Sequence, residues 1–190
     1  MDDSNQIRIL QAADELFNTR GYKSVTISDL AEKLGMSKKT IYQSFSGKEE
    51  IAAAVMESVM GRIADRFEQM EPGDDPIAAL RSTLTQVKGE IVHLNPIFLE
   101  DIQKLLPDVW QRVQEFRVHK IMQIEHAIRA AQQLGLATEI DARLATVVFL
   151  ETVQSLIRPD SLARHGFSIH EALDALIDIF VSGIAKRRTD

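Results

Sequence analysis

Apolar residues recur at helical spacing along almost the whole chain, and this pattern restricts the possible folds more than any other feature. The stripes are interrupted by only five prolines and nine glycines among 190 residues. No segment shows the alternating pattern of a strand. The sequence therefore predicts an all-α protein, with helices at about 7–20, 27–34, 38–45, 48–70, 76–93, 96–105, 108–133, 139–157 and 168–186.

Composition excludes several classes of protein. The length suits one or two globular domains with a sizeable core. The chain has no cysteine, which excludes disulfide scaffolds, cysteine nucleophiles and thiolate zinc sites. Its start is acidic and polar, unlike a signal peptide, and no apolar run is long enough to span a membrane. We therefore expect a cytoplasmic protein without a membrane partner.

Charge is distributed unevenly along the chain. Residues 20–48 hold six lysines and arginines against two acids, a net charge of +4. Since the whole chain carries −6, the other residues sum to −10. A short basic island on an acidic body indicates that one end meets a polyanion, although chance clustering on a solvated face is the alternative.

The segment from Thr26 to Phe45 has the pattern of a helix-turn-helix. Thr26 with Asp29 forms the sequence of a capping box at the start of the first helix. Gly35 permits the left-handed conformation that ends this helix, and Ser37 caps the next one. Two helices joined so closely cross steeply, and the second can enter a major groove by its N-terminal end.

We accordingly predict three parts. Residues 1–47 form a helix-turn-helix domain, residues 48–71 a long connecting helix, and residues 72–190 a second helical domain. The sequence Glu71 to Pro76 ends the long helix.

Two lysines occupy the first turn of the second helix of the motif. Lys38 and Lys39 lie where the helix dipole disfavours cations by roughly 0.3–1 kcal/mol each. Lys48 repeats this placement at the start of the long helix, where Ser46 and Glu49 suggest another capping box. A cation beside unpaired N–H groups is favourable if a DNA phosphate docks there. We expect DNA contacts from Thr26, Ser37, Lys38, Lys39, Thr40, Tyr42, Gln43 and Lys48.

The stretch from Phe17 to Glu50 resembles the DNA-binding domain of the tetracycline-repressor (TetR) family. The resemblance is carried by Thr26-Ile27, Leu30-Ala31, Leu34-Gly35, Ser37, Thr40-Ile41-Tyr42, Phe45 and Lys48-Glu49-Glu50, and Lys39 departs from the small residue that many relatives carry. It implies about nine helices, a homodimer formed through the last two, and a C-terminal domain for ligand binding and dimerisation. It also implies a repressor that leaves a pseudo-palindromic operator in double-stranded DNA when an effector tilts the long helix.

The resemblance gives two sets of candidate residues in the C-terminal part. Polar and aromatic groups on apolar helices are candidates for the ligand cavity, although ordinary core packing explains several of them equally well: His93, Phe98, Trp110, Phe116, His119, Met122 and Phe149. An apolar cavity would suit a hydrophobic or aromatic effector. The last two helices offer Leu144, Val148, Ile157, Leu173, Leu176, Ile177, Phe180 and Ile184, which form either a dimer interface or the core of this chain.

Two other classes of function remain as alternatives. The basic island could belong to a helical adaptor that binds an acidic protein. A small helical-bundle enzyme is disfavoured, because the sequence has no phosphate loop, no nucleophile elbow and no complete H-E-x-x-H motif. His119, His126 and Glu115 could share a helix face, but without a further ligand we predict no metal site and no cofactor.

Overall fold

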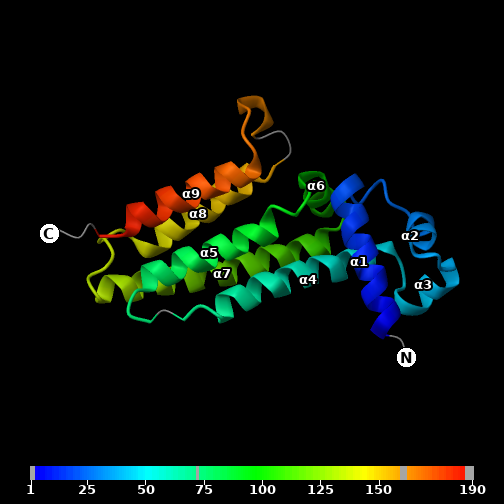
Figure 1. Ribbon diagram of the computed structural model, residues 1–190, viewed down its shortest axis with the longest axis horizontal. Helices are drawn as coiled ribbons and strands as arrows, with labels where there is room; N and C mark the ends of the chain where they lie inside the picture. Colours follow the sequence, from blue (N-terminus) through cyan, green and yellow to red (C-terminus); the bar gives the residue numbers. More distant parts are fainter. Residues whose placement is uncertain (1–2, 72, 159–161, 187–190) are drawn as a thin grey trace. The chain divides into compact units, whose positions relative to one another are not determined.

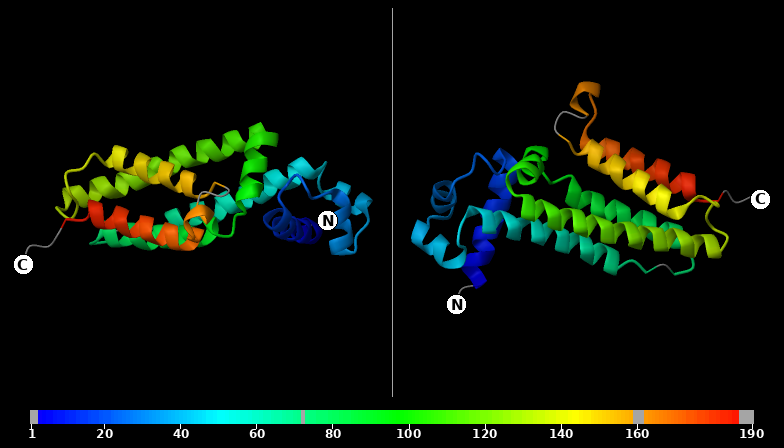
Figure 2. Two further views of the ribbon diagram at one scale, coloured as in Figure 1. Left: turned by 90° about the horizontal axis from the view of Figure 1, so that it is seen from above. Right: turned by 180° about the vertical axis from the view of Figure 1, so that it is seen from behind.

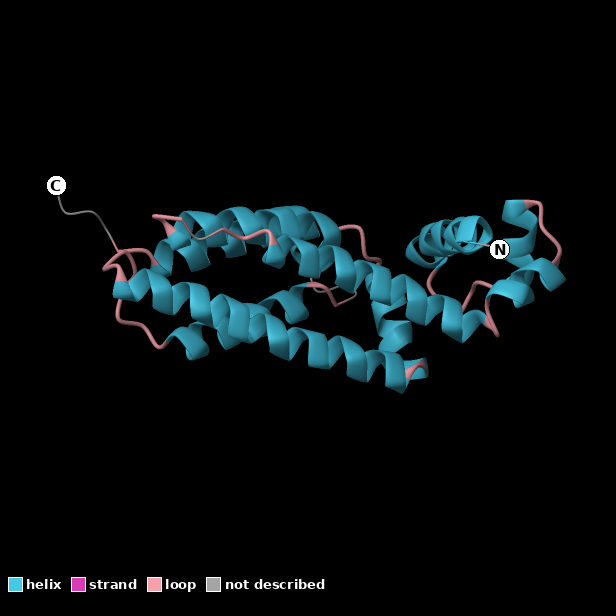
Figure 3. Cartoon of the chain, turned by 90° about the horizontal axis from the view of Figure 1, so that it is seen from below, coloured by secondary structure: helices cyan, strands magenta, loops and turns pink. Residues whose placement is uncertain are grey.

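The computed structural model describes residues 3–71, 73–158 and 162–186, and these residues form helices joined by loops (Figures 1 and 3). Its helices are α1 (Asp3–Arg20), α2 (Ile27–Leu34), α3 (Lys38–Ser44), α4 (Lys48–Glu68), α5 (Pro76–Ile91), α6 (Pro96–Leu105), α7 (Pro107–Gln133), α8 (Ala142–Leu156) and α9 (Ile169–Ile184). A 3-10 turn at Ala163–His165 precedes α9, and an isolated antiparallel bridge joins Ala137 to Ala185. The predicted all-α fold is confirmed.

Short capping sequences fix where several helices begin. Asn95 accepts a hydrogen bond from the N–H of Ile97 at 2.8 Å, and Pro96 supplies the first residue of α6. Asp141 caps α8 in the same way, with its carboxylate 2.8 Å from the N–H of Leu144. Helix α8 therefore begins at Ala142, three residues later than its apolar pattern predicts.

The chain divides into two compact units whose boundaries differ from the predicted domains at 47 and 71. Unit 1 comprises residues 1–61 and 93–113, and unit 2 comprises residues 62–92 and 114–190. Unit 1 thus takes in most of α4, all of α6 and the beginning of α7. The reason is tertiary, because α6 packs against α1 although they lie far apart in the sequence.

Aromatic stacking joins α6 to α1 inside unit 1. The ring of Phe98 lies 5.2 Å from that of Phe17, and both side chains are fully buried. Beside this stack, Asn95 donates two hydrogen bonds to Asn18, from its N–H to the side-chain carbonyl at 2.8 Å and from its side-chain amide to the backbone carbonyl at 2.9 Å. Gly21 follows α1 with φ +77°, and a Cβ there would lie 2.9 Å from the side chain of Ile97. Glycine is therefore needed for both the turn and the close approach.

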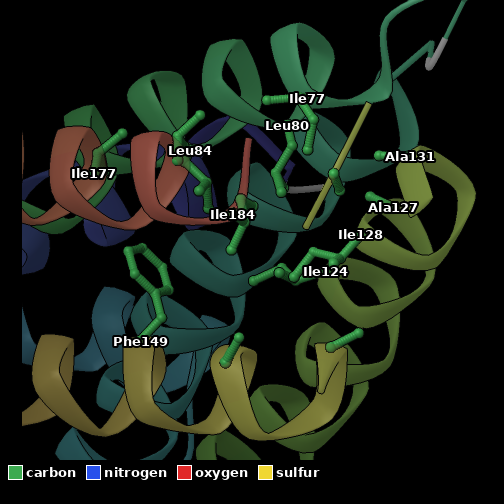
Figure 4. Packing of buried hydrophobic residues seen from close by; sticks show 14 of the residues in the cluster. Ile77, Leu80, Leu84, Ile124, Ala127, Ile128, Ala131, Phe149, Ile177 and Ile184 are labelled. Atoms are coloured by element: carbon green, nitrogen blue, oxygen red, sulfur yellow. The ribbon is translucent and has the colours of Figure 1, made fainter. Parts of the chain in front are cut away.

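The core of unit 2 is formed by α5, α7, α8 and α9 with the end of α4 (Figure 4). Ile124 and Ile128 of α7 are fully buried and belong to the same apolar cluster as Leu80 and Leu84 of α5. The ring of Phe149 in α8 stacks on that of Phe180 in α9 at 4.4 Å. In the described part of the chain, we find no helix with both the length and the apolar character to cross a bilayer.

Candidate nucleic-acid interface

Helix α2 begins with a complete capping box. The Thr26 hydroxyl accepts a hydrogen bond from the N–H of Asp29 at 3.2 Å, and the Asp29 carboxylate accepts one from the N–H of Thr26 at 2.7 Å. The hydroxyl of Thr26 also donates to this carboxylate. These bonds, led by the one from the hydroxyl, hold the pKa of Asp29 below its ordinary value of 3.8. The start of α2 is therefore set by local sequence.

A tight turn separates α2 from α3 (Figure 2). Gly35 adopts the left-handed conformation at φ +61°, and its N–H bonds to the carbonyl of Glu32 at 3.2 Å. The Ser37 hydroxyl then accepts a hydrogen bond from the N–H of Thr40 at 3.1 Å, which caps α3. Ile41 and Phe45 are buried and anchor this second helix against the rest of unit 1. The predicted helix-turn-helix is present.

The opposite face of α3 is exposed and basic. Lys38, Lys39, Tyr42 and Gln43 are all exposed, with Tyr42 at 53%. Among residues 3–71, 73–158 and 162–186, no carboxylate forms an ion pair with Lys38 or Lys39. The first turn of α3 also holds no acidic residue. Two cations therefore lie beside unpaired helix N–H groups, an arrangement that an external anion would stabilise.

Three predicted contact residues already make bonds within the motif. The hydroxyls of Thr26 and Ser37 serve as helix caps, and the Thr40 hydroxyl lies 2.9 Å from that of Ser37. A hydroxyl both donates and accepts, so these bonds do not use its full capacity.

Lys48 does not face outward toward a DNA phosphate as predicted, because its ammonium is bonded within unit 1. Its Nζ donates hydrogen bonds to the carbonyl oxygens of Tyr22, at 3.0 Å, and Val25, at 2.8 Å. It also lies 4.1 Å from the centre of the Tyr22 ring. Burial lowers the pKa of its ammonium. Lys48 thus fixes the α1–α2 loop from within unit 1, a role that sequence analysis missed because its partners lie more than twenty residues away.

The capping residue of α4 also differs from the prediction. Glu50, and not Glu49, accepts hydrogen bonds from the N–H and hydroxyl of Ser46, at 2.6 and 2.7 Å. These two bonds lower the pKa of Glu50. The carboxylate closes the turn one residue later because Gly47 lies between Ser46 and the first helical residue.

Known proteins share the sequence of this helix-turn-helix. The profile described as "Bacterial regulatory proteins, tetR family" matches residues 9–55, the segment that holds the helix-turn-helix. The chain carries a TetR-family DNA-binding domain at these residues. It is a DNA-binding regulator of transcription and not an enzyme.

Relatives extend the similarity to the whole chain. The HTH-type transcriptional regulator TtgR of Pseudomonas putida is 27% identical, over 95% of this chain and 93% of its own length. The TetR family transcriptional regulator PfmR from Thermus thermophilus is 26% identical, with a TM-score of 0.74 over 93% of this chain and 98% of its own. SmeT, repressor of the Stenotrophomonas maltophilia multidrug efflux pump SmeDEF, shares the fold at 20% identity and a TM-score of 0.77, covering 96% and 91%.

TetR-family regulators bind operator DNA and small-molecule effectors and act as dimers. The seven candidate effector contacts of this chain fall into both units. Phe98 does not contact an effector as predicted, because it is fully buried in the aromatic core of unit 1. His93 and Trp110 also belong to unit 1, where His93 is exposed and Trp110 half-buried.

The other four candidates belong to unit 2. Phe116 is half-buried, His119 and Met122 are exposed, and Phe149 is buried against Phe180. The structure therefore does not gather the seven into one cluster.

The candidate dimer residues divide by exposure. Leu144 and Val148 on α8 are 61% and 57% exposed, one helical turn apart. The half-buried candidates are Ile157, Leu176 and Phe180. Three of the candidates are at most 5% exposed and belong to the core of this chain instead of a dimer interface: Leu173, Ile177 and Ile184. Ile179 on α9, which was not among the candidates, is 71% exposed.

Proposed function

We propose that this regulator is a repressor in which two copies of the chain hold a pseudo-palindromic operator through α3. The observation that carries the proposal is the exposed pair Lys38 and Lys39, which has no ion pair in the described part of the chain and lies on a helix held by Ile41 and Phe45. Phosphate oxygens would complete the electrostatics of this helix end.

Specific contacts follow from which side chains are exposed. Lys38 and Lys39 would bind phosphates or guanine edges, and Gln43 would read adenine. Tyr42 and Thr40 would donate to phosphates, with the capping hydroxyls of Thr26 and Ser37 at the edge of the contact. Lys48 supports the loop before α2 and makes no phosphate contact. Because the partner is chromosomal DNA, we place the protein in the cytoplasm.

Salt dependence tests the DNA contacts. The bound sequence is first selected from a random DNA pool, and its affinity is then measured at several salt concentrations. Lys38→Gln and Lys39→Gln should each reduce the slope of log affinity against log salt by about 0.9. Lys104→Gln is the matched control, since Lys104 is an exposed lysine of α6 paired with Glu100. Unchanged slopes in both α3 variants would refute the proposed contacts.

The dimer would form on the exposed apolar side chains of α8 and α9. Leu144, Val148 and Ile179 are the most exposed apolar residues of these helices, and Leu176 and Phe180 flank them in a half-buried position. Leu144→Glu with Val148→Glu should convert the dimer to a monomer in analytical ultracentrifugation. Leu134→Glu is the control, because Leu134 is 58% exposed but follows α7. A double variant that remains dimeric would exclude this face.

Release of the operator would follow from binding of an apolar small molecule to the helices of unit 2. Support comes from the apolar residues that these helices share and from SmeT, of which a complex with triclosan is known. Such a ligand shifts the population between DNA-competent and incompetent forms by its differential affinity for them. Screening hydrophobic and aromatic compounds for loss of operator binding tests this step.

A further inference from the structure

Lys120 occupies a core position of α7. It lies one turn before Ile124 and two turns before Ile128, both of which are fully buried. Lys120 itself is 9% exposed, and no other lysine or arginine of the described residues is buried to this extent. An apolar residue is expected at this position of the stripe, and the lysine therefore departs from the pattern of its own helix.

The partners of the Lys120 ammonium are neutral. Its Nζ donates a hydrogen bond to the side-chain carbonyl of Gln123 at 2.7 Å. The centres of the Phe67 and Phe116 rings lie 5.1 and 4.9 Å away. No carboxylate of the residues that the structure describes lies within ion-pair distance, and the negative charge felt at longer range is that of exposed Glu68.

Other shielded cations of unit 2 are compensated differently. Lys88, whose side chain is 11% exposed, forms an ion pair with Asp174 at 2.5 Å. Arg117 is hydrogen-bonded to Gln154 and lies 3.4 Å from Glu151. Burial lowers the pKa of Lys120, in keeping with a charge that its surroundings do not fully stabilise. Lys120 therefore has donors left for an anion that the described residues of this chain do not supply.

We propose that Lys120 binds the carboxylate of an effector whose apolar body packs on Phe67 and Phe116. The inference rests on the proposed function, since it assigns a chemical class to the effector of unit 2. A single ammonium flanked by two rings matches a monovalent anion attached to an apolar group. A phosphate would bring a second charge with no cation to meet it.

Isothermal titration calorimetry of the full-length protein tests this assignment. The probes are octanoate and phenylpropionate, each compared with the alcohol of the same skeleton. We expect each acid to bind at least about tenfold more tightly than its alcohol. Lys120→Met should remove this preference, and Lys120→Arg should retain most of it. Arg129→Met is the control, because Arg129 is an exposed cation of the same helix, paired with Glu125.

Folding of the variants is checked separately. Lys120→Met replaces a buried charge by an apolar chain of similar length, so its melting temperature should equal or exceed that of the parent. Lys120→Gln serves as a second variant if Lys120→Met is poorly folded.

Three results would overturn the assignment. These are equal affinities for acid and alcohol, undiminished acid binding by Lys120→Met, or no binding of either acid at millimolar concentration. Because calorimetry needs no DNA, these results leave the proposed repressor intact. Failure of the repressor would instead appear as the absence of salt-sensitive operator binding.

Discussion

The ammonium of Lys48 lies 2.8 Å from the carbonyl oxygen of Val25 and donates a hydrogen bond to it across 23 positions of sequence. A second bond, to the carbonyl of Tyr22, holds the other end of the same loop. Since Thr26 follows Val25 and starts α2, Lys48 determines where the helix-turn-helix begins relative to α4.

Replacing Lys48 with methionine should therefore weaken operator binding without changing its salt dependence. The loop would lose two charge-assisted hydrogen bonds, which we expect to lower stability by about 1–3 kcal/mol. The slope of log affinity against log salt should stay that of the parent, because no phosphate contact is removed. A slope reduced by about 0.9, as for a phosphate-binding lysine, would contradict the positioning role.

Gly35 and Gly61 offer a matched pair of glycine substitutions. Gly35→Ala should lower stability by roughly 1–2 kcal/mol, because φ +61° is strained for alanine although no atom lies within 4 Å of the added Cβ. Gly61→Ala, inside α4 and equally free of neighbours, should raise stability by roughly 0.5–1 kcal/mol. Urea unfolding of both variants checks the signs. Equal effects would show that backbone conformation is not the cause.

Acid should weaken the start of α2 through Asp29. Its pKa lies below 3.8 in the folded protein, so its stabilising contribution is complete above that value and is lost as the pH falls through the folded pKa. Asp29→Asn should therefore destabilise the protein at neutral pH and have a smaller effect at about pH 3. Asp65→Asn, at an exposed position of α4, is the control. The measurement is urea unfolding at several pH values, and a pH-independent difference would exclude this linkage.

Phe98→Ala should destabilise unit 1 by about 3–5 kcal/mol, because it leaves a cavity beside Phe17. Operator binding should weaken at temperatures where unit 1 begins to unfold. Denaturation followed by circular dichroism measures the loss. Phe167→Ala is the control, since Phe167 is 60% exposed and should cost little. A small effect at Phe98 would mean that α6 does not stabilise α1.

Much of the local structure could be predicted because its causes lie within a few residues. The capping box of Thr26 and Asp29, the left-handed Gly35 and the Asn95-Pro96 start of α6 all act over one turn of helix. The exposed face of α3 follows in the same way, since burying Ile41 and Phe45 turns Lys39 and Gln43 outward.

Tertiary structure decided which apolar face meets which neighbour. Periodicity identified the stripes of α8 and α9, but only packing separated exposed Leu144 and Val148 from buried Ile177. In the same way, Phe98 joined the core of unit 1, and Lys48 turned inward to the carbonyls of a distant loop. A helical pattern specifies the direction of a side chain around its own axis, whereas its partners depend on segments brought together by the fold.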